Sequence, residues 1–286
     1  METLSAGNKK IKNLQAYQRS AKDRREAGIF IAEGIKMFRE APADWIKEVY
    51  MTPDALDKIS GARENSSAGE GAKSITDTGL PMYLVESEVF KRISDTRTPQ
   101  GVLTVLKRPE YTLDGIISGI SGHGKDVTAD RSSGRIPLLL ILENLQDPGN
   151  LGTILRVGEA AGVTGVIMSR GCVDIFNPKV IRSTMGSIYR MPFYIASDLA
   201  KTICELKKNG ITTYAAHLKG ANIYTDNDYR GATAFLIGNE GNGLTDEITA
   251  LADRRVFIPM EGSVESLNAG ISAAILSYEA HRQRKI

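Results

Sequence analysis

The stretch PLLLILENLQDPGNLGTILRVGEAAGVTGVIM, residues 137–168, decides the fold of this chain. It begins with an uninterrupted apolar run over 137–142, which is typical of a strand buried on both faces of a parallel sheet. The turn that follows offers Asp147 and Asn150 as alternative helix caps, with Pro148 acceptable in the first helical turn. A second apolar run over 165–168 predicts another strand, so the stretch is a strand, a helix and a strand.

The predicted helix has one apolar face, because its apolar and small residues follow the spacing of a buried stripe: Leu151, Ile154, Leu155, Gly158 and Ala161. Arg156 lies off that stripe. Its guanidinium is therefore expected near the carboxyl end of the preceding strand, where ligands collect in open α/β sheets. The alternative is a solvated arginine that pairs with Glu159.

Composition places the chain among ordinary globular proteins. Its 286 residues leave room for about two domains, and 42% are hydrophobic and 24% charged. No apolar segment has membrane-spanning length and no signal peptide is recognised, so we expect a cytoplasmic protein. The two cysteines and three histidines have no ligand spacing, which argues against a metal site. A net charge of +2 does not by itself indicate nucleic acid.

Two domains and a linker are predicted. Residues 1–110 form a small α/β domain with a polar, flexible loop at 60–79, and residues 111–136 form a flexible linker. Residues 137–286 alternate strand and helix, which predicts a parallel sheet covered on both faces. The last helix is expected over 265–284, with an apolar stripe (Leu267, Ile271, Ala274, Ile275 and Tyr278) assigned to the core first and to an interface second.

The first 25 residues carry a local excess of positive charge on an otherwise balanced chain. A solvated helix face would explain this excess. A contact with the phosphate backbone of RNA is the other interpretation, and its candidate residues are Lys9, Lys10, Lys12, Arg24 and Arg25.

Two further turns follow predicted strands of the C-terminal domain. Residues 237–244, IGNEGNGL, open a helix, and their backbone amides are suited to hold a polar or anionic ligand. The glycine order there, GxxGxG, is not the GxGxxG of dinucleotide-binding folds, which argues against a nicotinamide-dependent oxidoreductase. Residues 258–268, IPMEGSVESLN, place Ser266 and Asn268 near a helix start, which capping alone would also explain.

Taken together, the segments 150–156, 236–244 and 258–268 closely resemble the three motifs of the SpoU (TrmH-like) family of RNA ribose 2′-O-methyltransferases, in the SPOUT class. Residues 9–106 also resemble the family's L30e-like substrate-binding domain, notably in GIFIAEG at 28–34 and TPQGV at 98–102.

The resemblance implies an S-adenosylmethionine-dependent enzyme with a deep trefoil knot in its C-terminal domain, acting as a homodimer through that domain. It assigns catalysis to Arg156, Asn150, Glu240, Ser266 and Asn268. Cofactor contacts are assigned to Gly238, Asn239, Gly241, Ile258, Met260 and Leu267. The expected substrate is large-subunit ribosomal RNA. The alternatives are a tRNA-directed enzyme of the same kind and a catalytically silent RNA-binding protein in ribosome assembly.

Overall fold

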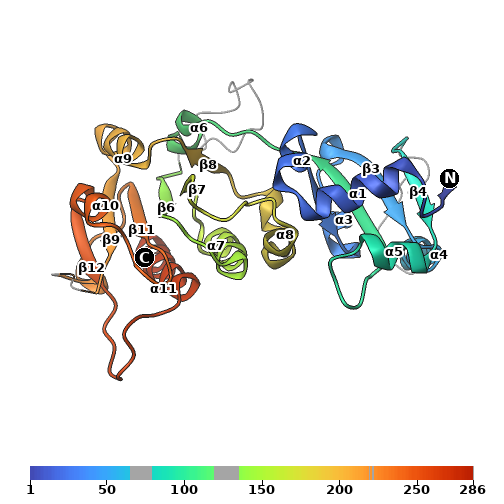
Figure 1. The fold of residues 1–286 in the computed structure, drawn as a ribbon. Coiled ribbons are helices and arrows are strands. Elements are labelled where there is room, and N and C mark those ends of the chain that lie inside the picture. Colours follow the sequence, from blue (N-terminus) through green and yellow to red (C-terminus); the bar gives the residue numbers. More distant parts are fainter. Residues whose placement is uncertain (65–78, 119–134, 219, 221, 286) are drawn as a thin grey trace. The chain divides into compact units, whose positions relative to one another are not determined.

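The computed structural model describes residues 1–64, 79–118, 135–218, 220 and 222–285 (Figure 1). Within them the chain forms two compact units: unit 1 comprises Met1–Pro109 and Phe176–Tyr189, and unit 2 comprises Glu110–Ile175 and Arg190–Ile286. Most of the predicted loop at 60–79 and of the predicted linker lies outside the described residues. None of the described helices is long and apolar enough to cross a membrane.

Unit 1 is built on a five-stranded mixed sheet in the order β1-β4-β3-β5-β2, in which β2 and β3 run antiparallel to β5. The element bounds are β1 (Glu2–Leu4), α1 (Lys9–Arg19), α2 (Ala21–Glu26), β2 (Ile29–Glu33), α3 (Ile35–Glu40), η1 (Ala43–Trp45), β3 (Ile46–Met51), α4 (Pro53–Glu64), β4 (Met82–Val85), α5 (Ser87–Ile93) and β5 (Val102–Lys107). Residues 60–64, predicted as loop, are therefore the last turn of α4.

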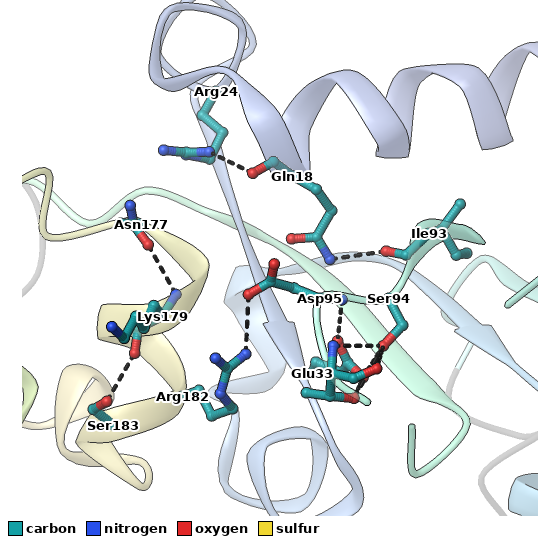
Figure 2. A network of polar contacts seen from close by, with 11 residues as sticks. Gln18, Arg24, Glu33, Ile93, Ser94, Asp95, Asn177, Lys179, Arg182 and Ser183 are labelled. Atoms are coloured by element: carbon teal, nitrogen blue, oxygen red, sulfur yellow. Dashed lines mark hydrogen bonds and ion pairs between the residues drawn. The ribbon is translucent and has the colours of Figure 1, made fainter. Parts of the chain in front are cut away.

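A segment from the middle of the predicted C-terminal domain packs in unit 1. It contains α8 (Pro178–Thr184) and η4 (Ser187–Tyr189). The Arg182 guanidinium donates to the Asp95 carboxylate at 3.1 Å, and the Tyr189 hydroxyl donates to the Met37 carbonyl at 3.1 Å (Figure 2 shows the Arg182–Asp95 pair). Sequence periodicity did not predict that residues 176–189 pack in unit 1, because periodicity indicates which residues are buried and not which element covers them.

Unit 2 contains a seven-stranded sheet in the order β10-β12-β9-β11-β6-β7-β8, and every neighbouring pair is parallel, as predicted. Its elements are α6 (Leu113–Ile117), β6 (Leu138–Leu142), α7 (Pro148–Ala161), β7 (Gly165–Ser169), β8 (Phe193–Ala196), α9 (Leu199–Lys208), β9 (Thr212–Ala216), β10 (Asn222–Ile223), η5 (Tyr224–Asp226), β11 (Thr233–Ile237), α10 (Asp246–Leu251), β12 (Arg254–Phe257) and α11 (Ala269–Lys285).

Strand β6 is the interior strand that its apolar run predicts. It pairs with β11 on one side and β7 on the other, and all five of its residues are buried. Leu139 and Ile141 pack with α9 and α10 on one face of the sheet, whereas α7 and α11 pack against each other and α11 contacts β6 and β11 (Figure 1). Burial on both faces explains why β6 carries no polar residue.

Helix α7 begins and ends where its sequence indicates. The Asp147 carboxylate accepts a hydrogen bond from the Asn150 amide at 2.8 Å, so Asp147 is the cap and Asn150 lies inside the first turn. Gly162 ends the helix with φ at 82°, a left-handed conformation that glycine adopts without strain. The five residues predicted as its apolar face are all buried.

Three predictions about helices were wrong. Residues 113–117 were assigned to the linker but form α6, because Thr112 caps a turn whose Ile116 packs into the core of unit 2. Helix α11 begins at Ala269 and not at 265. Its buried face is Ala273, Leu276 and Ala280, so the predicted stripe is not core: Ile271 is 49% exposed and Tyr278 is 48% exposed.

Candidate active site

A pocket of about 390 Å³ lies in unit 2 at the carboxyl ends of β9, β11 and β12. The turns after β11 and β12 supply most of its lining, because neighbouring parallel strands deliver their following turns to the same edge of a sheet. The apolar residues Leu244, Ile258 and Leu276 share the wall with residues 238–243. The six residues predicted to contact a cofactor all line this pocket: Gly238, Asn239, Gly241, Ile258, Met260 and Leu267.

Gly238 is required by the turn itself. A Cβ atom placed on it would lie 2.1 Å from the carbonyl carbon of Gly243 and 2.1 Å from the Leu244 amide nitrogen. Asn239 and Gly243 close the turn through reciprocal backbone hydrogen bonds of 3.0 and 2.9 Å. The glycine therefore permits two backbone segments to touch, and any ligand in the pocket would meet a turn already closed.

Glu240 connects this turn to the start of α7. Its Oε1 accepts hydrogen bonds from the Asp147 amide at 3.1 Å and from Asn150 Nδ2 at 2.9 Å, and its Oε2 accepts one from the Gln146 amide at 3.2 Å. The Asn150 Oδ1 in turn accepts a hydrogen bond from Asn268 Nδ2 at 2.8 Å. Three of the residues predicted to be catalytic, from three separate segments, thus form one connected chain.

The same hydrogen bonds set the ionisation of Glu240. Burial by itself would raise the pKa of the Glu240 carboxyl, but donation from Asn150 and from the Gln146 and Asp147 amides outweighs burial, and the pKa is lowered from its ordinary value. Glu240 is therefore an anion at neutral pH. Since Glu265 also lines the pocket, the pocket is suited to a ligand that carries positive charge.

Asn144 and Gln146 were not predicted as site residues. Asn144 follows β6 with φ at 52°, an uncommon conformation for a residue with a side chain, and its carbonyl accepts hydrogen bonds from Asn239 Nδ2 at 2.8 Å and Gln146 Nε2 at 3.1 Å. Ser169, the last residue of β7, donates from its Oγ to Asn144 Oδ1 at 3.0 Å. Polar residues directly after a buried strand were the available signal.

Arg156 is exposed on α7, and within the described parts of the chain its guanidinium has no hydrogen bond or ion pair. The alternative of a pair with Glu159 is wrong, because Glu159 pairs with Arg190. Asn150, Thr153 and Arg156 follow at three-residue spacing and form one ridge of α7. That ridge meets α11, where a Cβ on Gly270 would lie 3.3 Å from Thr153 Cγ2.

The remaining predicted site residues differ in where the structure places them. Ser266 lines the pocket, whereas Asn268 lies outside its lining and caps α11, its Oδ1 accepting from the Gly270 amide at 2.9 Å.

In unit 1, Arg24 is only 3% exposed and donates to the Tyr17 carbonyl at 2.7 Å (Figure 2 shows its hydrogen bond to Gln18). The prediction that Arg24 contacts RNA was therefore wrong, because the buried guanidinium donates to carbonyl groups at the carboxyl end of α1.

Lys10 is also engaged within unit 1, where its ammonium pairs with Glu48 and lies 4.6 Å from the centre of the Tyr83 ring. The other three cations predicted for RNA, Lys9, Lys12 and Arg25, are exposed. Their exposure keeps them available as contacts to phosphate.

Comparison with known proteins agrees with this site. Residues 137–278 match the SpoU rRNA Methylase family, and residues 8–104 match the MRM3-like substrate binding domain. The chain is 28% identical over 274 residues, 96% of each chain, to the 23S rRNA (guanosine(2553)-2′-O)-methyltransferase RlmP of Bacillus subtilis. It is 31% identical to the 23S rRNA (guanosine-2′-O-)-methyltransferase RlmB of Ralstonia nicotianae, with 75% of this chain and 82% of that protein covered.

Among solved structures, the chain is similar to an AdoMet-bound rRNA methyltransferase from Sinorhizobium meliloti, with a TM-score of 0.77, 26% identity and coverage of 99% of this chain and 97% of that one. Likeness thus extends over both units, and the matched range 137–278 contains the pocket, the Glu240 chain and Arg156. The chain belongs to the SpoU rRNA methylase family.

Proposed function

We propose that this protein transfers a methyl group from S-adenosylmethionine to a ribose 2′-hydroxyl of large-subunit ribosomal RNA. The observation that carries the proposal is the hydrogen-bonded chain from Glu240 through Asn150 to Asn268, because it joins three motifs of an rRNA methylase family beside a single pocket. The relatives RlmP and RlmB are 23S rRNA 2′-O-methyltransferases, which supports the choice of ribosomal over transfer RNA.

The pocket at the ends of β9, β11 and β12 fits S-adenosylmethionine. Its volume lies within the range of about 300–1,000 Å³ that is usual for small-molecule sites. Its apolar wall suits the adenine ring, and the closed turn at Gly238 offers backbone groups to the polar parts of the cofactor. When bound, S-adenosylmethionine supplies a methyl group on a positively charged sulfur, which the Glu240 and Glu265 carboxylates would favour.

In the reaction, the ribose hydroxyl releases its proton to solvent water as the new oxygen–carbon bond forms, and the carbon–sulfur bond breaks to leave a neutral thioether. We assign Arg156 to stabilise the developing negative charge on that oxygen or on the flanking phosphate. An arginine remains protonated at physiological pH and is a poor general base. The Glu240–Asn150–Asn268 chain fixes the start of α7, so its contribution is to hold the ridge that carries Arg156.

We further propose a homodimer through unit 2, with the apolar stripe of α11 as part of the interface. Ile271, Ala274, Ile275 and Tyr278 recur at helical spacing on one face of α11, where Ile271 and Tyr278 are exposed and Ala274 and Ile275 are half-buried. A second copy of the chain would cover this stripe by the two-fold pairing that is commonest among oligomers. Replacing Ile271 by Asp should produce monomers in light scattering, whereas the matched change at Ile223, 37% exposed on β10, should not.

Family membership also supports three finer assignments: a trefoil knot in unit 2, an L30e-like fold for residues 1–110 and a methyltransferase domain over 137–286.

The exposed residues Lys9, Lys12 and Arg25 are proposed to contact RNA phosphates. Replacing them by Gln should weaken RNA binding and flatten its salt dependence, because fewer counterions would be released. A cytoplasmic location stays a prediction.

The test of the function is methyl transfer from labelled S-adenosylmethionine to purified RNA fractions from a strain that lacks the gene. Label is expected in the large-subunit RNA, as a ribose methylation that is absent before incubation. Label confined to transfer RNA would support the tRNA-directed alternative. RNA binding without label in any fraction would support the catalytically silent alternative.

A further inference from the structure

A second pocket, of about 290 Å³, lies in unit 1 between α1 and the strands β2, β3 and β5. The buried side chains Leu14, Ile29 and Val105 give it an apolar base, and the half-buried Tyr17 adds an aromatic wall. Its volume is near the lower end of the range for small-molecule sites, about 300–1,000 Å³. No residue of the proposed methyl-transfer site belongs to it.

A fixed carboxylate stands in this pocket. Glu48 accepts the Lys10 ammonium on Oε1 and the Tyr50 hydroxyl on Oε2, the latter at 2.5 Å. A carboxylate offers about four acceptor positions on its two oxygens, so one remains on each oxygen after these bonds. The Glu48 side chain is 29% exposed, and the two free positions can reach a ligand without breaking the bonds that orient the group.

Two lysines line the pocket together with that carboxylate. Lys10 is held between Glu48 and the Tyr83 ring. Lys47 makes only a 3.5 Å contact with the Ala27 carbonyl, and no carboxylate of the described residues lies within ion-pair distance of it. Its charge is therefore available. Such a set is unusual for a purely structural pocket, because one carboxylate and two cations leave net positive charge beside an aromatic wall.

We propose that this pocket binds an unpaired guanine nucleotide of the substrate RNA, distinct from the nucleotide that is methylated. This inference rests on the proposed function, because that function makes RNA the substrate. Guanine alone among the four bases presents two adjacent donor groups, N1–H and N2–H, to a carboxylate, and its O6 accepts from an ammonium such as Lys10. Unstacked RNA bases are commonly read on these edges while they lie against an aromatic side chain, and Tyr17 is placed to serve as that side chain.

Lys47 completes the site as the partner of the nucleotide's phosphate. A lysine ammonium binds phosphate as a point charge and carries no base preference. The proposal therefore separates two contributions: Glu48 gives the preference for guanine, and Lys47 gives affinity that every nucleotide shares.

The experiment measures binding of the full-length protein to short single-stranded RNAs by fluorescence anisotropy. The RNAs differ at one position, which holds guanine, inosine or adenine. Inosine lacks the 2-amino group and so removes one of the two donors. We expect about tenfold weaker binding for inosine and at least as large a loss for adenine, within the scale of one base-specific pair. Equal affinity for the three RNAs would overturn the proposal without any variant.

Glu48→Gln should abolish the difference between guanine and inosine, while Glu88→Gln, a matched change at an exposed carboxylate of α5, should preserve it. Lys47→Met should weaken all three RNAs equally. An unchanged circular dichroism spectrum and unfolding temperature show that the variants fold, because the substituted residues lie in unit 1 and the S-adenosylmethionine pocket in unit 2 does not report on that unit. Methyl transfer to RNA without guanine preference would reject this inference alone, and guanine preference without methyl transfer would count against the proposed function alone.

Discussion

Replacing Arg156 by Ala tests the centre of the proposed mechanism. The side chain is exposed and has no hydrogen bond or ion pair with the described residues, so its loss breaks no such interaction among them. We expect the free energy of unfolding to change by less than about 0.5 kcal/mol, as for surface positions in general. S-adenosylmethionine affinity should also persist, because Arg156 is not among the residues that line the pocket.

The effect on the reaction should be much larger. Removing one group that stabilises developing charge lowers rates by about 100-fold to 1,000-fold. Arg156 is exposed and its field is partly screened by water, so we expect the lower end, about a hundredfold or about 2.7 kcal/mol. Single-turnover methyl transfer with saturating RNA is the proper assay, since it separates the chemical step from binding and product release.

Two comparisons make this result decisive. Arg255→Ala, an exposed arginine of β12 outside the pocket lining, controls for loss of one positive charge from unit 2. Arg156→Lys keeps the charge and loses the planar fork, so weak recovery indicates bidentate geometry and strong recovery indicates charge alone. A parent rate for Arg156→Ala under single-turnover conditions would refute the assignment and make Arg156 an ordinary surface residue.

The other predictions concern the turn, its anion and the thiols. Gly238→Ala should abolish calorimetric binding of S-adenosylmethionine and lower the unfolding temperature, because its Cβ would meet the Gly243 backbone at 2.1 Å; binding at parent affinity would show that the turn can relax. Hydrogen bonding lowers the pKa of the Glu240 carboxyl in the folded protein. The contribution of its negative charge to folding stability is therefore complete above the ordinary pKa of 4.5, and it is lost as the pH falls through the lower folded value. Cofactor affinity titrated downward from neutral pH should follow that course, and Glu240→Gln should flatten it. Partial burial raises the pKa of the Cys172 thiol, so maleimide followed by mass spectrometry should label the exposed Cys204 first; equal rates would contradict this difference in exposure.

Local sequence was sufficient wherever burial and capping act within one element. The apolar run of β6, the stripe of α7 and the glycine that ends it follow from spacing and backbone conformation, and the structure confirms each of them. The parallel sheet followed from the alternation of strands and helices. The pocket lining was also foreseeable, since turns after neighbouring parallel strands meet at one edge.

Tertiary structure decided what faces each side chain. Only the folded chain shows that Glu240 accepts hydrogen bonds from residues about ninety positions earlier, or that Glu159 pairs with Arg190 and leaves Arg156 without a partner among the described residues. Charge counts placed Arg24 among the RNA contacts, whereas packing of α1 against α2 buries it. Packing likewise leaves Ile271 and Tyr278 of the apolar stripe of α11 exposed. Periodicity identifies an apolar face, but the choice between the core and a partner depends on which elements the fold brings against that face.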